Sequence, residues 1–218
     1  GQFDEAAIAF EDAIEHDPSH APSHINLAGA LHASDRADEA LTASEQALKL
    51  LPSSRSAMIN RGNALKTLVR FDEAEEQYRT LIANDKNDAT AHDLLGTVLQ
   101  GQAQLEEAIA EYRTAIKLDS RESLFRGDLA TALLANGSLR EGWDLYDARF
   151  GSNDDLVRPR KVGLAPWQGE SLAGKTLYIW REQGVGDDLR FASCFADVID
   201  RAKAEGGKVI IETDPRLM

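Results

Sequence analysis

The chain has 218 residues, enough for one or two domains with a sizeable core. Its 37 acidic residues outnumber its 24 Lys and Arg, and the formal net charge of −13 disfavours nucleic acid as a main partner. One cysteine excludes an intrachain disulfide, and no apolar run approaches the roughly 20 residues that span a bilayer. No basic-then-apolar leader follows Gly1, so we expect a cytoplasmic protein without a membrane span.

A repeat with a period of 34 residues runs through the N-terminal part of the chain. Five related stretches recur in the same register, and no repeat is missing from the series. They are GQFDEAAIAF, DRADEALTAS, VRFDEAEEQY, AQLEEAIAEY and GSLREGWDLY, which begin at residues 1, 35, 69, 103 and 137. Such a period predicts pairs of antiparallel helices that stack on their neighbours.

Small residues recur where the two helices of a pair would cross. The second helix supplies Ala6, Ala40, Ala74, Ala108 and Gly142, and the first supplies Ala28, Gly62, Gly96 and Ala130. An aromatic slot holds Phe10, Tyr78, Tyr112 and Tyr146, with Ser44 as the exception, and we assign this stripe to the core. The pattern resembles the tetratricopeptide repeat (TPR) over residues 1–150, which implies an all-α superhelix of about 4.5 repeats.

The chain departs from the TPR pattern at two kinds of position. Lys86 and Ser120 replace the proline that usually ends a repeat, so we expect looser turns there. The aromatic residue of the first helix is replaced by His24, Met58, His92 and Arg126. Gly1 falls between the two helices of a repeat, which leads us to expect further repeats before it.

In a TPR superhelix the first helix of each pair lines the concave groove. The candidate peptide-binding residues there are Asn26, Asn60, Asn63, Lys66, Thr97 and Gln100. An Asn amide offers a donor and an acceptor to a peptide backbone. The segment SHINLAGAL resembles repeats of O-GlcNAc transferase, whose groove carries an asparagine ladder, although Leu94 and Asp128 interrupt the ladder here. The resemblance implies a protein or peptide ligand, and the alternative is that these are ordinary solvated groove residues.

Two other sites are weaker alternatives. A basic clamp for a C-terminal carboxylate would need Lys66 together with Arg55 or Arg61 in the groove. A metal-binding helix face could be read from His16, His20 and His24, which are spaced by four. Prolines lie between these histidines, so they span a turn, and we expect no metal and no cofactor.

The C-terminal part has a different pattern. Residues 151–174 form a linker rich in Gly and Pro, residues 175–180 a strand, residues 189–204 a helix and residues 208–212 a second strand. Gly184 and Gly186 form a glycine loop where the helix begins. This order predicts a partial α/β segment, a parallel, Rossmann-like βαβ unit. A dinucleotide fingerprint would need glycine at position 189, which is Leu189.

The phrase W-x-G-x-x-L-x-G-K from Trp167, followed by E-Q-G-x-G-D ending at Asp187, resembles bacterial proteins in which TPR arrays precede a GT-B glycosyltransferase domain. The piece from Gly186 to Leu189 also resembles the heptosyltransferase-like family. These resemblances imply that Asp187 is the catalytic base of a longer parent, and that residues 175–218 begin its α/β domain. A nucleotide sugar would bind only a donor-binding half outside this chain, so we expect the fragment itself to be inactive. Helix capping is the other role open to Asp187.

The function expected from the sequence is therefore a scaffold that recruits an acceptor or partner protein for a fused glycosyltransferase. Two rivals stay open. The chain could be a stand-alone TPR adaptor with no catalytic role, or its repeats could be fused to a different α/β enzyme.

Overall fold

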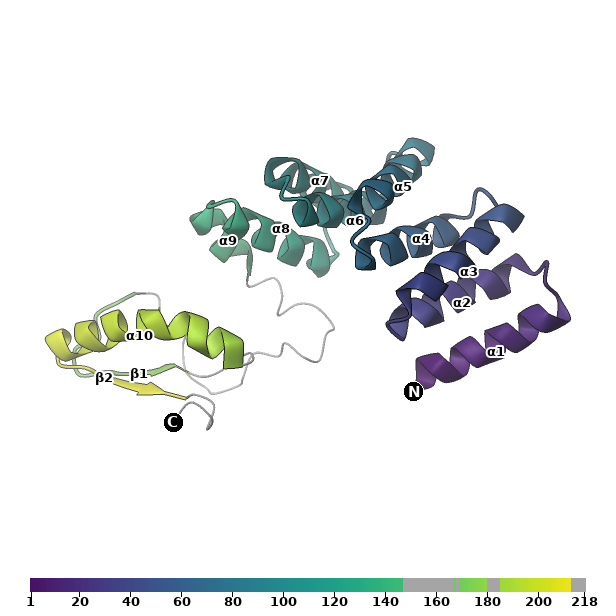
Figure 1. The fold of residues 1–218 in the computed structure, drawn as a ribbon. Coiled ribbons are helices and arrows are strands. Elements are labelled where there is room, and N and C mark those ends of the chain that lie inside the picture. The colour runs from purple at the N-terminus through teal and green to yellow at the C-terminus, as the bar shows by residue number, and fades with distance from the viewer. Residues whose placement is uncertain (147–166, 168, 180–184, 213–218) are drawn as a thin grey trace. The chain divides into compact units, whose positions relative to one another are not determined.

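A computed structural model describes residues 1–146, 167, 169–179 and 185–212, with the side chains of Ser123 and residues 185–194 left out. The chain divides into two compact units, Gly1–Ser152 and Asn153–Met218. In the described part, the first unit is a succession of antiparallel helices and the second is a small α/β unit (Figure 1).

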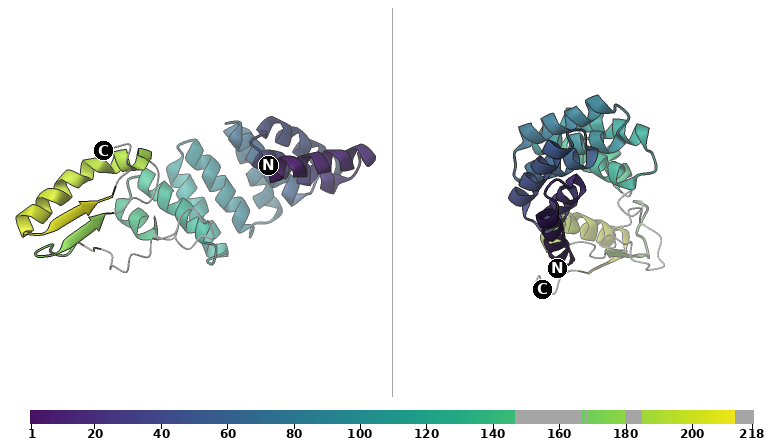
Figure 2. Two further views of the ribbon diagram at one scale, coloured as in Figure 1. Left: turned by 90° about the horizontal axis from the view of Figure 1, so that it is seen from below. Right: turned by 90° about the vertical axis from the view of Figure 1, so that its right-hand side faces the viewer.

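The helices of the first unit alternate along the chain as the second and first helices of successive repeats. Their bounds are α1 (Gln2–His16), α2 (Ala21–Ala33), α3 (Ala37–Leu50), α4 (Arg55–Thr67), α5 (Phe71–Asn84), α6 (Ala89–Gly101), α7 (Leu105–Leu118), α8 (Ser123–Ala135) and α9 (Leu139–Tyr146). Consecutive helices pack against each other, and α2 also contacts α4, as α6 contacts α8. These second-neighbour contacts join first helices of repeats, which places those helices along the inner side of the array, whose curvature Figure 2 shows.

The turn between the two helices of a repeat has the same backbone geometry at four places, and we call this turn the joint. The second residue after the first helix has a positive φ, at Asp35 (60°), Val69 (59°), Ala103 (61°) and Gly137 (80°). The next residue donates its N–H back to the last turn of that helix, as Arg70 does to the Leu65 carbonyl at 2.9 Å. This is the Schellman arrangement, which satisfies carbonyls that would otherwise lack donors. Only at Gly137 does the sequence place the residue that this conformation favours.

The helix crossings use the predicted small residues. Ala40, Ala74 and Ala108 are fully buried on the second helices, and Ala28 and Ala130 on the first. At Gly62 and Gly96 the space is taken by a ring: an added Cβ would lie 2.5 Å from Tyr78 and 2.8 Å from Tyr112, respectively. The glycine and the aromatic residue are therefore a matched pair, as the close packing of a protein core requires.

Three of the four residues that replace the usual aromatic of the first helix contact the turns between repeats. Nε2 of His24 lies 3.0 Å from the Pro18 carbonyl, and Nε2 of His92 lies 3.2 Å from that of Lys86. Arg126 donates to the Ser120 carbonyl in the same way. At residues 86 and 120, where looser turns are expected, a side chain six residues further on contacts the carbonyl.

The second unit contains strand β1 (Thr176–Ile179), helix α10 (Val185–Glu205) and strand β2 (Lys208–Ile211) in its described part. The strands pair in parallel, with Thr176 opposite Lys208 and Ile179 opposite Ile211. The helix begins four residues before the predicted position 189, so Gly186 and Asp187 lie in its first turn. A two-stranded sheet with one crossover helix is smaller than a Rossmann-like domain, so the described residues show only a small βαβ unit.

The tryptophan-glycine phrase before β1 has a structural role. The guanidinium of Arg201 on α10 lies 5.2 Å from the centroid of the Trp167 ring and donates to the Gly169 carbonyl at 2.7 Å. Glu205 accepts from the Ser171 hydroxyl at 2.9 Å, and its contacts, with that to Arg201 the largest cause, hold the pKa of Glu205 down to about 2. The segment is thereby fastened to the end of α10.

Candidate functional site: the inner face of the repeats

The six predicted groove residues lie on the inner helices: Asn26 on α2, Asn60, Asn63 and Lys66 on α4, and Thr97 and Gln100 on α6. Asn26 is exposed to solvent. Nδ2 of Asn60 donates to the Ile25 carbonyl at 2.8 Å, which links α4 to α2. Asn60 therefore holds two repeats together, and the asparagine ladder, which the sequence already shows interrupted at Leu94 and Asp128, reduces to the amides of Asn26 and Asn63.

The buried tyrosines reach this face with their hydroxyl groups. The hydroxyl of Tyr78 donates to Oδ1 of Asn63 at 2.8 Å. That of Tyr112 lies 3.0 Å from Oε1 of Gln100 and 3.4 Å from Oγ1 of Thr97. The rings belong to the core, as predicted, but their hydroxyl groups fix the orientation of three groove side chains. In the sequence, the only sign of these contacts is that tyrosine recurs on the second helix of repeats whose first helix carries polar groove residues.

A desolvated pair of carboxylates lies near the predicted lysine. Burial, with Asp128 as the next cause, raises the pKa of Asp93 to about 7, and burial likewise raises the pKa of Asp128. The positive charge of Lys66 opposes both shifts. Oδ1 of Asp93 is fully buried and has no hydrogen-bond partner among the described residues. Buried polar atoms normally find a partner, so a donor brought by a ligand would be stabilised here.

The basic clamp is not formed. Arg55 makes a bidentate contact with Asp88, the residue that caps α6, with nitrogen–oxygen distances of 2.5 and 2.7 Å. Arg61 donates to Gln77 on α5 at 3.0 Å. Both guanidinium groups therefore serve the packing of neighbouring helices, and Lys66 has neither of these arginines beside it to grip a carboxylate.

The three histidines spaced by four each contact a different group and do not form one cluster. His16 Nδ1 lies 2.7 Å from the Asp12 carbonyl, His20 Nδ1 lies 2.8 Å from the Ser23 hydroxyl, and His24 contacts Pro18. Among the residues that the structure describes, no group of His, Cys, Asp and Glu could hold a metal ion. Over the same residues, no helix has the length and apolar character needed to cross a membrane.

Only part of the predicted glycine loop lies among the residues that the structure describes. Gly184 lies outside the described residues, whereas Gly186 and Asp187 belong to the first turn of α10. Nothing is described of the Asp187 side chain. Its place three residues into the helix suits either a capping or a catalytic carboxylate.

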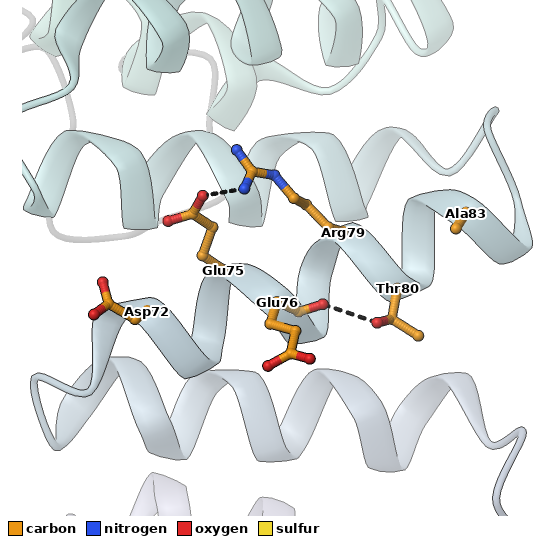
Figure 3. Close-up of a pocket in the computed structure, with 6 residues that line it drawn as sticks. All are labelled: Asp72, Glu75, Glu76, Arg79, Thr80 and Ala83. Atoms are coloured by element: carbon orange, nitrogen blue, oxygen red, sulfur yellow. Dashed lines mark hydrogen bonds and ion pairs between the residues drawn. The ribbon is translucent and has the colours of Figure 1, made fainter.

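A shallow pocket on the outer face, along α5, is lined by Asp72, Glu75, Glu76, Arg79, Thr80 and Ala83 (Figure 3). Its guanidinium already pairs with Glu75, one helical turn away, and the Thr80 hydroxyl donates to the Glu76 carbonyl at 2.9 Å. These contacts lie within one helix, so the inner face is the better candidate for ligand binding.

The stacked helix pairs and the polar inner face define a helical-repeat protein with an extended binding surface. Sequence models of the tetratricopeptide repeat match residues 1–43, and also residues 33–89 and 94–155. The chain belongs to the tetratricopeptide repeat family.

One curated relative is similar over part of the chain. Protein FlbA of Caulobacter vibrioides is 37% identical over 73 residues, which are 33% of this chain and 12% of that protein. The chain thus matches only about an eighth of that relative's length.

Solved structures share the fold. A thermophilic TPR protein of Thermus thermophilus superposes with a TM-score of 0.64 at 20% identity, covering 72% of this chain and 86% of that one. A MamA segment from Desulfovibrio magneticus gives 0.61 at 21%, covering 70% and 89%. YrrB, described as a TPR protein with an unusual peptide-binding site, gives 0.54 at 17%, covering 71% and 79%.

Proposed function

We propose that the protein is an interaction scaffold whose inner face, formed by α2, α4, α6 and α8, binds an extended segment of a partner protein. The observation that carries the proposal is the desolvated Asp93 carboxylate, whose Oδ1 is buried without a donor among the described residues. The amides of Asn26 and Asn63 on the same face can pair with a peptide backbone. The peptide-binding site named for YrrB is consistent with this role, although that similarity concerns the fold.

The test is to select peptides from a random 12-residue library on the wild-type protein and to measure their affinities for a variant with Asn26→Ala, Asn63→Ala and Asp93→Ala. We expect a loss of about 1–3 kcal/mol, at roughly one per hydrogen bond removed. Asn60 is left intact because it joins two helices. Glu76→Ala, on the outer face of α5, is the matched control and should bind normally. Equal affinities for the wild type and the triple variant would remove the inner face from peptide binding.

For the second unit, we propose that residues 151–174 are a linker and that residues 175–218 begin a GT-B-like glycosyltransferase domain in a longer parent. The parallel crossover with its glycine-containing helix start supports this, together with the motif resemblance given above. The repeats would then recruit the acceptor protein, and the nucleotide sugar would bind in the parent's other half. The family models and solved structures match the repeats and do not speak to this second role.

Asp187→Asn in the full-length parent tests the proposed base. Asn keeps the shape of Asp and a hydrogen-bonding oxygen, but it cannot take a proton from an acceptor hydroxyl. We expect turnover to fall by about 10²–10⁴ while the melting temperature stays near that of the wild type. Normal turnover would leave Asp187 as a helix cap.

A further inference from the structure

The groove between α1 and α3, on the outer side of the repeats, holds a cavity of about 470 Å³. Leu27 and Leu31 of α2, together with Ala43 of α3, form its apolar floor. Its rim carries three carboxylates, those of Glu11 and Glu15 on α1 and Glu39 on α3. The cavity is separate from the inner face, where the proposed peptide would bind.

The next groove along the repeat, between α3 and α5, shows what these positions can hold. Arg61 of α4 stands there at the position equivalent to Leu27. Its Nη1 donates to Oε1 of Gln77 at 3.0 Å, its Nε lies 3.6 Å from Oε1 of Glu45, and its Nη2 lies 4.0 Å from Oε2 of Glu73. The side chain is 24% exposed. A guanidinium is thus held between the carboxylates of two neighbouring second helices.

Each partner of Arg61 has its counterpart 34 residues earlier, and all of these counterparts line the cavity. Glu11 corresponds to Glu45, Glu39 to Glu73 and Ala43 to Gln77. The first groove therefore retains the carboxylates that hold a guanidinium, while Leu27 and Ala43 leave its volume open.

The charges of the two grooves differ accordingly. In both, an arginine at the start of the second helix pairs with the nearby glutamate: Arg36 with Glu39 at 2.6 and 2.7 Å, and Arg70 with Glu73 at 2.7 and 2.8 Å. The second groove adds Arg61, whereas the first adds only carboxylates. Arg36 also lies 3.9 Å from Glu11, about as far as Arg61 lies from Glu73, so Glu15 is the rim carboxylate without an ion pair among the described residues. His24 also lines the first groove, with its Nε2 at the Pro18 carbonyl.

We infer that the cavity between α1 and α3 is a receptor for an arginine side chain presented by a partner protein. The aliphatic stem would lie on Leu27 and Ala43, and the guanidinium would lie between Glu11 and Glu39, as the guanidinium of Arg61 does in the next groove. Arginine suits this site because its planar fork can contact two carboxylates while its stem covers apolar surface. Lysine offers a point charge without that geometry.

The test is a titration of the protein with Nα-acetylarginine amide, followed by NMR chemical shifts. We expect saturable shifts at residues of the α1–α3 groove, with a dissociation constant on the order of millimolar for a single side chain. Nα-acetylcitrulline amide has the same shape without the charge and should produce no saturable shift. Equal shifts from citrulline, or from Nα-acetyllysine amide, would overturn the assignment to a guanidinium site.

Two variants locate the site. Leu27→Arg places the chain's own guanidinium in the cavity, as Arg61 does in the next groove, and should abolish the shifts while the circular dichroism spectrum stays helical. Glu11→Gln with Glu15→Gln keeps the shape and should weaken binding at least about fivefold, the equivalent of one charge interaction. Glu76→Gln on α5 is the matched control. If the double variant binds like the wild type, the inference is wrong, whatever the folding of Leu27→Arg.

Discussion

The repeat formed by α2 and α3 and the repeats formed by α4 to α7 solve one packing problem in two ways. In the first, the equivalent positions hold the buried Ala28 and Ser44, and the Ser44 hydroxyl donates to the Leu41 carbonyl of its own helix at 2.8 Å. In the others, Gly62 and Gly96 make room for Tyr78 and Tyr112. Loss of one methyl on the first helix thus accompanies gain of a ring on the second, which keeps the crossing filled.

The difference reaches the binding face. A tyrosine passes from the core to the inner surface and orients Asn63, Thr97 or Gln100 with its hydroxyl group. Ser44 is too short to do so and makes its hydrogen bond locally. The inner surface is therefore internally braced at α4 and α6, while at α2 the amide of Asn26 is exposed. One repeat pattern produces both a braced and an open stretch of groove.

Truncating the core residue should separate the two kinds of repeat most clearly. Tyr112→Ala removes a buried ring and should cost about 3–5 kcal/mol of unfolding free energy. Ser44→Ala removes one local hydrogen bond and should cost only about 1 kcal/mol. Urea unfolding measures both. Similar costs for the two variants would mean that the tyrosine crossing is not tighter than the serine crossing.

Adding a methyl group to the glycine of the pair tests the same idea from the other side. Gly96→Ala would place Cβ 2.8 Å from the Tyr112 ring, and we expect destabilisation of about 1–3 kcal/mol. Gly127→Ala on α8 is the matched control, because nothing lies within 4 Å of its added Cβ. It should stabilise by about 0.5–1 kcal/mol through helix propensity. A stabilised Gly96→Ala protein would contradict the matched-pair account.

The stability of the protein should also depend on pH, through Asp93 on α6. The pKa of Asp93 is raised from 3.8 to about 7, so the folded protein holds this proton more tightly than the unfolded chain. Its stability contribution is full below pH 3.8 and is lost as the pH rises towards 7. Asp93→Asn should therefore stabilise the protein by about 1–2 kcal/mol at pH 8 and change little at pH 3.5.

The control for this pH dependence is Asp12→Asn, which changes an exposed carboxylate on α1. Thermal melts of both variants across this range give the comparison. A gain for Asp93→Asn that is the same at both ends of the range would show that its carboxyl group titrates normally.

The smallest effect is expected at the turns, which both kinds of repeat share. Val69 is β-branched, 68% exposed and held at a φ of 59°, where only glycine is unstrained. Val69→Gly should stabilise by about 1 kcal/mol, and Asp35→Gly by less, because Asp tolerates this conformation better. Equal changes at the two positions, measured by thermal unfolding, would show that strain at Val69 is not the cause.

The 34-residue period predicted the helix pairs well because the crossing of two helices depends on residue size, which the amino-acid sequence shows directly. The small residues of the second helices, from Ala6 to Gly142, lie at the positions that the 34-residue period predicts. So do those of the first helices, from Ala28 to Ala130. The groove residues were assigned to the correct helices, but their hydrogen bonds were not predictable, because Asn60 finds its partner on another repeat. Asp93 was missed, since the cause of its raised pKa is burial, which no single letter reveals. The left-handed turns were hidden because three of the four residues there are not glycine.

The repeated joint after each inner helix also has a mechanical consequence. Asp35, Val69, Ala103 and Gly137 set the direction in which the chain leaves each helix, and they do so at one register with nearly the same φ in the first three. The course of the whole array is thus the same small rotation applied again and again. A change in one joint would redirect every repeat that follows it, so the alignment of the inner faces along the array is governed by single residues at the joints.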